Sequence, residues 1–480
     1  MSKQLITFLL FLIFFISSTT YYYYWTVPAN SIWYDQRAAI EVFQKIIDGQ
    51  FPLVGYNHSI GIPSFAAFYY IFSPVYYFLN QPIQLYYFTA FINVLSILIL
   101  STFLYFKLNP FSAIIFGVYS VTNIWGLYYG SFLWNPNFIP FFMTFLCIFI
   151  LKYFETKKVH YFHLSGLFIN LITQFSPQAI ILVFSFGVSV IKFKKLPKII
   201  HLYWHCILHL ILVSPWLVHT LILQPKSNTP SHGKLFKDFS SPLLEYTSYV
   251  GGWGLTQEWG KFLDYGTIIS QENFIFIPLL LSSTTVSLLL IAFLSLKYLR
   301  GNHIFTINKS WANLTYFLCL TNICSLFFFV LGIRVNTHHF QFLTPTLGLI
   351  LIIGLCQQKK YLKLYISLLL FIIFSQGTYS YWRAYSESIR PYITDIGYQE
   401  IFSDYVKDQC SNSARVRYVT PNGIHGYMQY GELEEEVSSC DWMLVQKNHY
   451  DLSIVIRDLL NEKFQLSQIN FKDYLIWIPK

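Results

Sequence analysis

Asp35 is the residue of this 480-residue chain whose type and position most favour chemistry. It lies in the segment Ser31–Arg37, shortly after the aromatic run Tyr21–Trp25. A carboxylate held between aromatic rings beside a partly apolar cavity can serve as a general base. Aspartate is also a favoured helix cap, and a helix is expected to begin near Gln36 and to include the amphipathic stretch Ala38–Asp48. Two roles are therefore open for Asp35: general base or helix cap.

The composition of the rest of the chain indicates what must position this carboxylate. Hydrophobic residues make up 54% of the sequence, aromatic residues 20% and charged residues only 11%, against about 25% charged in a soluble domain. The apolar residues form long blocks, several of them near the ~20 residues that a bilayer requires. These features exclude a soluble globule, a disordered chain and a disulfide-rich secreted module. They predict an all-α polytopic membrane protein.

We expect about eleven transmembrane helices in this chain. The stretch Ile62–Leu79 is apolar enough to be a twelfth, but counting it as a crossing would move Lys107 to the outer side of the membrane. We therefore expect this stretch to be re-entrant or interfacial. The expected spans are Leu5–Tyr24, Gln84–Phe106, Pro110–Tyr128, Phe138–Phe154, Tyr161–Gln174, Ala179–Ile191, Ile199–Leu223, Phe274–Leu296, Trp311–Ile333, Phe340–Cys356 and Tyr361–Tyr381.

The charges between these spans predict the orientation of the chain. With the N-terminus inside, Glu155 is the only acid on the inner side, as the positive-inside rule demands. The net charge of +9 is then an orientation signal plus an attraction to anionic headgroups, and it requires no nucleic acid. The inner cations are Lys3, Lys107, Lys152, Lys157, Lys158, Lys192, Lys194, Lys195, Lys198, Lys297, Arg300, Lys309, Lys359, Lys360 and Lys363.

The charges thus predict that the N-terminus is cytoplasmic and the C-terminal domain extracytoplasmic. A cleaved signal peptide is the alternative for the first span, because Lys3 precedes its apolar run. No small-residue cleavage site stands out, and the aromatic run Tyr21–Trp25 suits a membrane anchor.

Three outer segments carry most of the polar mass: Trp25–Ile83, Gln224–Asn273 and the tail after Tyr381. We divide the chain into a transmembrane module, residues 1–381, and a small extracytoplasmic α/β domain, residues 382–480. The tail shows no catalytic motif, and its Cys410 and Cys440 could form a disulfide in an oxidising compartment or remain free. The tail is expected to form helices over Tyr398–Asp408, Ile424–Glu436 and Leu452–Glu462, and strands over Arg415–Thr420, Asp441–Gln446 and Tyr474–Pro479.

Three patches beyond Asp35 have a familiar layout. They are Ile62–Phe65, a proline-headed apolar stretch; Gly130–Asn137, which reads GSFLWNPN; and Thr337–Pro345, which reads THHFQFLTP. Together with the single span and the early acid, this layout resembles the GT-C superfamily of membrane glycosyltransferases. The closer likeness is to bacterial relatives of protein O-mannosyltransferases and of the aminoarabinose transferase that modifies lipid A.

The resemblance implies transfer of a sugar from a polyprenyl-phosphate donor to a glycan, lipid or protein acceptor on the outer face. Asp35 falls where the family has its catalytic acid. A general base there takes the proton of the attacking hydroxyl, and the leaving phosphate needs cationic or hydrogen-bonding partners. The resemblance also implies a bacterial inner (plasma) membrane. No cofactor is required, and a divalent cation stays open as an alternative although no motif indicates one. The resemblance assigns phosphate binding to Arg37, Arg334, His338 and His339, and acceptor or sugar binding to Gln36, Trp134, Asn135 and Asn137.

The chain departs from the family pattern at several of these positions. Gln36 stands where the O-mannosyltransferases have a second acid. Asn135 and Asn137 stand in a segment where many relatives show aspartate, and an amide can hydrogen-bond an acceptor but cannot be a base. In the late segment the family arginine corresponds to His338 or His339, and a histidine binds phosphate strongly only when it is protonated.

Other functions compete with this one. A flippase or exporter of lipid-linked glycans is expected to show internal repeats and charges near the bilayer midplane, and neither is evident. A polymerase or ligase of outer glycans would have arginine-rich outer loops, whereas those before the tail contain only Arg37 and Arg334. A non-catalytic relative of the family is a further alternative, because Gln36 stands where the O-mannosyltransferases have a second acid.

One histidine row and one tryptophan have alternative roles of their own. His201, His205 and His209 recur at helical spacing on one expected span. They could form a ligand face or a proton relay, although a polar contact between helices is the simpler interpretation. Trp134 could be a sugar platform or an anchor at the membrane interface.

Overall fold

In the computed structural model the described residues are mostly helical, and they form two compact units. One unit comprises Met1–Val27 and Val42–Ala384, and the other comprises Pro28–Glu41 and Tyr385–Lys480. Besides scattered residues before Tyr34, the structure describes residues 34–57, 63–79, 82–220, 246, 250, 276–300, 308–326, 337–357 and 362–388, and the tail strands 415–420, 423–426, 441–446, 464–471 and 474–479.

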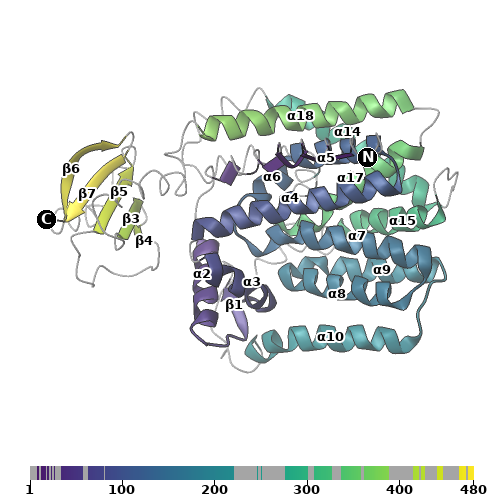
Figure 1. The fold of residues 1–480 in the computed structure, drawn as a ribbon, viewed down its shortest axis with the longest axis horizontal. Helices are drawn as coiled ribbons and strands as arrows, with labels where there is room; N and C mark the ends of the chain where they lie inside the picture. The colour runs from purple at the N-terminus through teal and green to yellow at the C-terminus, as the bar shows by residue number, and fades with distance from the viewer. Residues whose placement is uncertain are drawn as a thin grey trace. The chain divides into compact units, whose positions relative to one another are not determined.

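The first unit is a bundle of apolar helices. Figure 1 shows its long helices lying side by side with nearly aligned axes. The bundle helices are α4 (Pro82–Lys107), α5 (Pro110–Thr122), α6 (Ile124–Gly130), α7 (Ile139–Thr156), α8 (Val159–Phe175), α9 (Ile180–Lys192), α10 (Ile199–Val218), α14 (Phe276–Leu299), α15 (Lys309–Ser325), α17 (Thr344–Gln357) and α18 (Leu362–Ser388). Short 3-10 helices lie between some of them: η2 (Asn135–Phe138), η3 (Pro177–Ala179) and η6 (Thr337–Leu343).

Several of these helices are long and apolar enough to cross a membrane. In the described residues five helices meet that condition, or six if the bent pair α5 and α6 counts as one span. The segments Pro177–Lys192 and Phe340–Cys356 are apolar but shorter. The chain is therefore an integral membrane protein, whereas the number of eleven spans stays a prediction. The first expected span and the end of the span Trp311–Ile333 lie largely outside the described residues.

The expected span Pro110–Tyr128 is broken into two helices. α5 and α6 meet at Asn123 with a bend of 65°. Asn123 has an extended backbone, and its side chain accepts a hydrogen bond from the Gly126 amide at 2.7 Å. An asparagine side chain that caps a new helix competes with the continuous helical ladder. A short polar side chain thus ends one helix and begins the next inside an apolar stretch.

The centre of the bundle is α7, which contacts α4, α8, α15 and η6. Its side chains Met143, Leu146 and Ile150 are fully buried. α10 differs, because none of its residues is buried. With 18 residues, α7 is about 27 Å long, so it separates two ends of the bundle by nearly the thickness of a bilayer core.

The stretch Ile62–Leu79 contains a strand and a short helix. β2 (Pro63–Phe65) pairs antiparallel with β1 (Val54–Asn57). The helix α3 (Ala67–Leu79) follows; it has 13 residues and contains Pro74. At about 20 Å it is shorter than the ~30 Å core of a bilayer, a length that both the re-entrant and the interfacial alternative allow. Figure 1 shows α3 and β1 at one end of the bundle.

The amphipathic helix expected over Ala38–Asp48 is α2 (Tyr34–Ile47). It begins one residue before Asp35, which therefore lies in the first turn instead of preceding it as an N-cap would. The later half of α2 packs on α3, where the Phe43 ring contacts the rings of Phe68 and Tyr76 at 5.7 and 5.8 Å between centroids.

The tail contains a five-stranded sheet with strand order β4-β3-β5-β7-β6. β3 and β5 are parallel, and the other neighbours are antiparallel. The three predicted strands coincide with β3 (Arg415–Thr420), β5 (Asp441–Gln446) and β7 (Tyr474–Pro479).

Two further strands of this sheet were not expected from the sequence. The sequence pattern predicts no element over β6 (Phe464–Phe471). β4 (Gly423–Gly426) occupies the start of the predicted helix Ile424–Glu436. That part of the helix prediction is wrong, because β4 pairs along β3 over four residues, and cross-strand pairing overrides local helical preference. The rest of that helix, the other two predicted helices, Cys410 and Cys440 lie outside the described residues.

Candidate functional site

The loop between α6 and α7 contains three of the predicted site residues. Trp134, Asn135 and Asn137 lie at or in η2, and the exposed fractions of Asn135 and Asn137 are 5% and 0%. The Asn135 amide donates to the Phe175 carbonyl and the Asn137 amide to the Phe132 carbonyl, each at 2.8 Å. Asn93 of α4 in turn donates to the Asn137 carbonyl at 3.0 Å. Both asparagine amides therefore hold the loop in place through main-chain atoms.

Several buried amide groups around η2 lack a hydrogen-bond partner in the described part of the chain. They include the Oδ1 atoms of Asn135 and Asn137, both polar atoms of Gln174, and Nε2 of Gln341. α8 and η6, which carry these two glutamines, both contact η2. Buried polar groups in proteins are nearly always satisfied by protein or by ordered water. The region therefore has unused capacity to bind water or a hydroxyl group.

Trp134 connects this loop to the β1–β2 hairpin. Its indole Nε1 donates to the Tyr56 hydroxyl at 2.8 Å, and its ring stacks near Phe132 at 6.2 Å between centroids. In the hairpin, the Ser64 hydroxyl donates to the Tyr56 carbonyl at 3.1 Å and lies 2.9 Å from the Tyr69 hydroxyl. Trp134 is thus oriented by a specific hydrogen bond, which both of its predicted roles allow.

The far end of α10 reaches the same hairpin. Trp216 donates from Nε1 to the Pro63 carbonyl at 2.8 Å, and its ring lies 5.5 Å from that of Phe65 between centroids. Two tryptophans from separate helical segments therefore fix the hairpin between them. This end of the bundle is built from aromatic rings, hydroxyls and amides.

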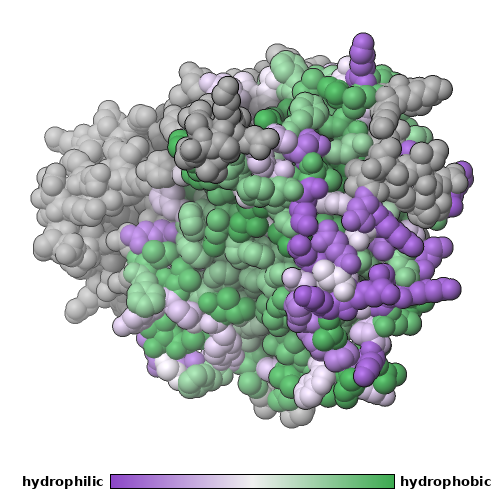
Figure 2. All heavy atoms as spheres, turned by 45° about the vertical axis from the view of Figure 1, so that its right-hand side comes forward, coloured by the Kyte–Doolittle hydropathy of each residue, from purple (hydrophilic) through white to green (hydrophobic). Residues whose placement is uncertain are grey.

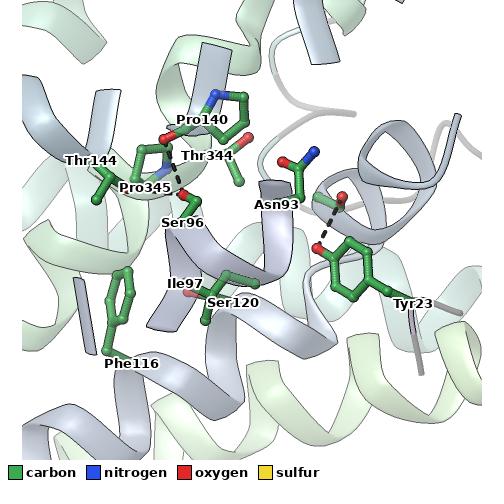
Figure 3. Close-up of a pocket in the computed structure, with 11 residues that line it drawn as sticks. Tyr23, Asn93, Ser96, Ile97, Phe116, Ser120, Pro140, Thr144, Thr344 and Pro345 are labelled. Atoms are coloured by element: carbon green, nitrogen blue, oxygen red, sulfur yellow. Dashed lines mark hydrogen bonds between the residues drawn. The ribbon is translucent and has the colours of Figure 1, made fainter. Parts of the chain in front are cut away.

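A small cavity lies inside the bundle beneath this loop (Figure 3). It measures about 20 Å³, which is room for about one water molecule and far below the size of a ligand pocket. Asn93 and Tyr23 line it, and the hydroxyls of Ser96 and Thr144 lie 2.9 Å apart at its wall. The Tyr23 hydroxyl donates to the Gly126 carbonyl at 3.4 Å, beside the bend between α5 and α6. The cavity suits a structural water that supports Asn93, and not a substrate.

The remaining predicted residues fall in two places. Asp35, Gln36 and Arg37 lie together in the first turn of α2, within the second unit, and Gln36 is buried. His338 and His339 lie in η6, whose main chain contacts η2 in the first unit. The structure thus brings the histidine segment next to the Trp134–Asn137 loop. Arg334 and the side chains of Asp35, Arg37, His338 and His339 lie outside the described residues.

The histidine row of α10 faces α8. Nδ1 of His163 in α8 lies 3.2 Å from Nε2 of His205, and its Nε2 lies 2.9 Å from Nδ1 of His201. Nδ1 of His209 lies 2.8 Å from Oδ1 of Asn170 in α8. The interhelical polar contact is therefore confirmed. Because His163 uses opposite ring nitrogens for its two partners, the three rings do not converge on one point as metal ligands must. In the described residues no group of three histidine, cysteine or acidic side chains could hold a metal ion.

Sequence reasoning did not find the residues that build this end. Tyr56 and Trp216 stand in stretches without a distinctive pattern, and Ser64 was noted only as part of the patch Ile62–Phe65. Asn93 carried a usable signal, since an amide inside a long apolar helix requires an internal partner. Gln174 carried the same signal at the end of α8.

These features define a polytopic helical membrane protein with a hairpin, a short interfacial helix and an aromatic and amide-lined loop at one end of the bundle. No model of a protein family matches the sequence, and neither does any curated protein.

The fold is nonetheless similar to that of a solved protein. It aligns with the crystal structure of ArnT from Cupriavidus metallidurans bound to undecaprenyl phosphate, with a TM-score of 0.54 and 8% sequence identity over 97% of each chain. At that identity the likeness establishes the fold. The chain therefore has an ArnT-like fold, in agreement with the fold that the sequence resemblance predicts.

Proposed function

We propose that this chain is a membrane glycosyltransferase that moves a sugar from a polyprenyl-phosphate donor to an acceptor at the extracytoplasmic face. The likeness to ArnT over 97% of both chains carries this proposal, because that structure holds undecaprenyl phosphate. A lipid-linked donor also fits a membrane protein physically, since its polyprenyl tail stays in the bilayer while its sugar meets the polar segments at the surface.

The reaction assigns a role to each predicted residue. An acceptor hydroxyl attacks the anomeric carbon, the bond from that carbon to the phosphate oxygen breaks, and polyprenyl phosphate leaves. Asp35 accepts the hydroxyl proton as general base. Arg37, Arg334, His338 and His339 stabilise the leaving phosphate. Gln36, Trp134, Asn135 and Asn137 orient the acceptor or the sugar.

The geometry around η2 supports the binding role. Trp134 is held by Tyr56 with its ring among other aromatic rings. Asn135, Asn137 and Gln341 have buried amide atoms without a partner in the described part of the chain. Water or substrate hydroxyls would complete these hydrogen bonds. The position of η6 beside η2 supports a phosphate-binding role for the histidine segment in the same region.

The decisive experiment measures release of polyprenyl phosphate from a panel of polyprenyl-phosphate sugars by the purified protein in nanodiscs. Wild type is compared with Asp35→Asn, which keeps size and hydrogen bonding but cannot take a proton. Asp48→Asn is the matched control, because Asp48 lies at the other end of α2 and accepts a hydrogen bond from Gln44 at 2.9 Å. We expect a loss of roughly 100-fold or more for Asp35→Asn and wild-type rates for the control.

Two other results would contradict this proposal. Equal rates for all three proteins would remove Asp35 from the chemistry. If wild type binds donors but consumes none, a flippase or exporter of lipid-linked glycans, or a non-catalytic relative, becomes the better assignment.

A further inference from the structure

The end of the bundle farthest from η2 collects cations. Figure 2 shows them as a hydrophilic patch on an otherwise largely apolar surface. They come from helix ends and from the turns that join them, so they gather there through the fold and not through one run of sequence. The described cations at this end are Lys107, Lys152, Lys157, Lys158, Lys192, Lys194, Lys195, Lys198, Lys297, Arg300, Lys309 and Lys363.

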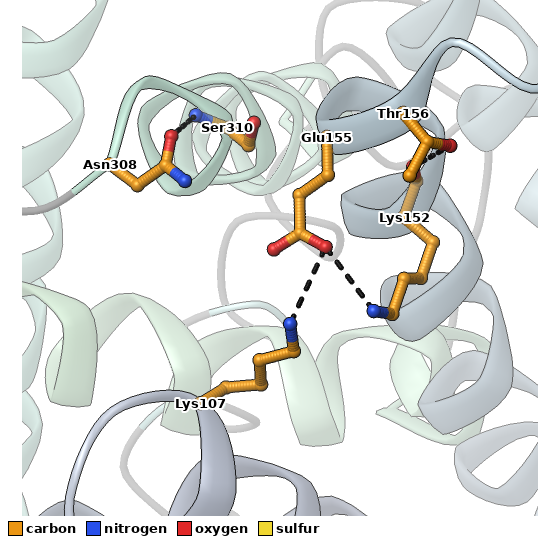
Figure 4. A network of polar contacts seen from close by, with 6 residues as sticks. All are labelled: Lys107, Lys152, Glu155, Thr156, Asn308 and Ser310. Atoms are coloured by element: carbon orange, nitrogen blue, oxygen red, sulfur yellow. Dashed lines mark hydrogen bonds and ion pairs between the residues drawn. The ribbon is translucent and has the colours of Figure 1, made fainter.

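The sequence supplies almost no counter-charge for them. Between Asp48 and Asp238 the only acid is Glu155, and between Glu272 and Glu387 there is none. The Glu155 carboxylate already lies 3.6 Å from the Lys107 ammonium and 3.3 Å from that of Lys152. Figure 4 shows it between these two lysines, with the start of α15 in the same view.

Three of the remaining lysines converge from different helices. Lys157 follows α7, Lys195 follows α9, and Lys309 begins α15. Ring contacts hold these ends together, with Phe193 lying 5.9 Å from Phe154 of α7 and 5.2 Å from Tyr316 of α15 between centroids.

The main chain fixes the position of Lys195 within this group. The Tyr153 hydroxyl donates to the Lys195 carbonyl, and the Lys195 amide donates to the Val190 carbonyl at 2.9 Å. Lys157 and Lys194 both have left-handed backbones, with φ of 57° and 54°. Such conformations are uncommon for residues other than glycine and persist where the surroundings enforce them.

The charges of Lys157 and Lys309 both act on Lys195. Lys195 is half-buried, and burial lowers its pKa, which the neighbouring charges of Lys157 and Lys309 lower further. Among the described residues none of these three lysines forms an ion pair with an acid, and like charges held together are a cost to the folded protein that a bound anion would remove.

We propose that Lys157, Lys195 and Lys309 form a binding site for a phosphate group at the membrane surface. Three ammonium groups can each donate a charge-assisted hydrogen bond to phosphate oxygens. The amino end of α15 adds a favourable dipole at the same place.

The position of the site favours a lipid as the source of the phosphate. The span Asn135–Thr156 ends one residue before Lys157, so the three lysines stand at the level where headgroup phosphates lie. A phospholipid with a single anionic headgroup would fill the site from the bilayer. A soluble phosphate compound has the same chemistry and is the alternative source. The site does not depend on the proposed transferase activity, since its test measures binding alone.

The test uses the full chain in neutral phosphatidylcholine nanodiscs containing a small fraction of phosphatidylglycerol, and it counts retained anionic lipid by native mass spectrometry. The triple variant Lys157→Gln, Lys195→Gln, Lys309→Gln is compared with Lys158→Gln, Lys198→Gln, Lys363→Gln. The second triple removes equal charge from exposed positions at the same end. Thermal unfolding of both confirms that they fold.

We expect the first triple to lose retained lipid by roughly 100-fold, the scale for three lysines at an anionic surface, and at least tenfold more than the control triple. Equal losses in the two triples would show a diffuse charge effect and overturn the site. Millimolar inorganic phosphate then identifies the source: displacement of the lipid assigns the site to soluble phosphate compounds, and persistence of the lipid assigns it to headgroups.

Discussion

The two ends of the helical bundle are built on opposite principles. Around η2, the polar groups are neutral and bind neighbouring main chain, as Asn135 and Asn137 do. At the other end of α7, the described charged groups are mostly lysines, and Glu155 is the single acid among the described residues there. The same helices begin or end at both ends of the bundle, so helix packing alone does not explain the difference in charge.

The difference shows what each end can recognise. Neutral amides, hydroxyls and aromatic rings suit a neutral polar ligand such as a sugar, since they offer hydrogen bonds without charge. Uncompensated lysines suit phosphate. The two ends therefore differ in the chemistry they can bind, and α7, which has 18 residues and is about 27 Å long, keeps them apart. The following substitutions test whether the two ends really differ in this way.

The largest expected effect is at the hairpin of the neutral end. A methyl group added by Gly55→Ala would meet the Tyr69 ring and the Ser64 hydroxyl. The hydroxyls of Ser64 and Tyr69 are hydrogen-bonded to each other at 2.9 Å. Tyr69 is fully buried, so the hairpin must shift, and overpacking of this kind costs about 1–3 kcal/mol. Unfolding in detergent measures the loss.

Gly187→Ala serves as the control for that substitution. Nothing lies within 4 Å of the added methyl group at this helical position, and alanine favours a helix by about 1 kcal/mol over glycine. Gly187→Ala should therefore be neutral or stabilising. A Gly55→Ala protein as stable as wild type would mean that the hairpin is not a fixed part of the site.

A smaller effect is expected for the hydrogen bond between Trp134 and Tyr56. Trp134→Phe and Tyr56→Phe each remove one partner of the 2.8 Å contact. A double-mutant cycle with both changes should give a coupling energy of about 1 kcal/mol. Additive losses would show that the tryptophan is held by ring packing alone.

The smallest effect on stability is expected at the charged end. Glu155→Gln removes the shared counter-charge of Lys107 and Lys152, whose side chains are about one third exposed. Pairs of this kind contribute at most about 1 kcal/mol and are screened by salt. The loss should thus be seen by unfolding at low ionic strength and disappear at high ionic strength.

Lys158→Gln is the control for that change, because Lys158 is exposed and forms no ion pair in the described residues. A loss in the Glu155→Gln protein that persists in concentrated salt would point to packing instead of charge. It would also weaken the contrast between the two ends.

Much of the architecture could be predicted because it depends on local composition. Long apolar stretches such as Gln84–Phe106 must be helical, since a bilayer leaves no other way to satisfy the backbone. The alternating strands Arg415–Thr420 and Asp441–Gln446 were equally visible. The bend at Asn123 could not be predicted from the sequence, because an asparagine inside an apolar run could also have formed a hydrogen bond with another helix.

The candidate site was predictable only in part. The loop Trp134–Asn137 was found through a family resemblance, and the structure places η6 with His338 and His339 beside it. Tyr56 and Trp216 could not be found, because each acts through a partner far along the chain. His163 escaped notice for the same reason, although its two partners on the α10 row, His201 and His205, were evident.

The sequence by itself determined that this protein lies in a membrane and where most of its described apolar helices run. These properties follow from the cost of placing polar groups in hydrocarbon, which acts on each segment separately. Only the tertiary structure decided which side chains meet: Trp134 with Tyr56, His163 with its histidines, and Lys195 with Lys157 and Lys309. Such meetings depend on how helices pack, and packing is a property of several segments at once.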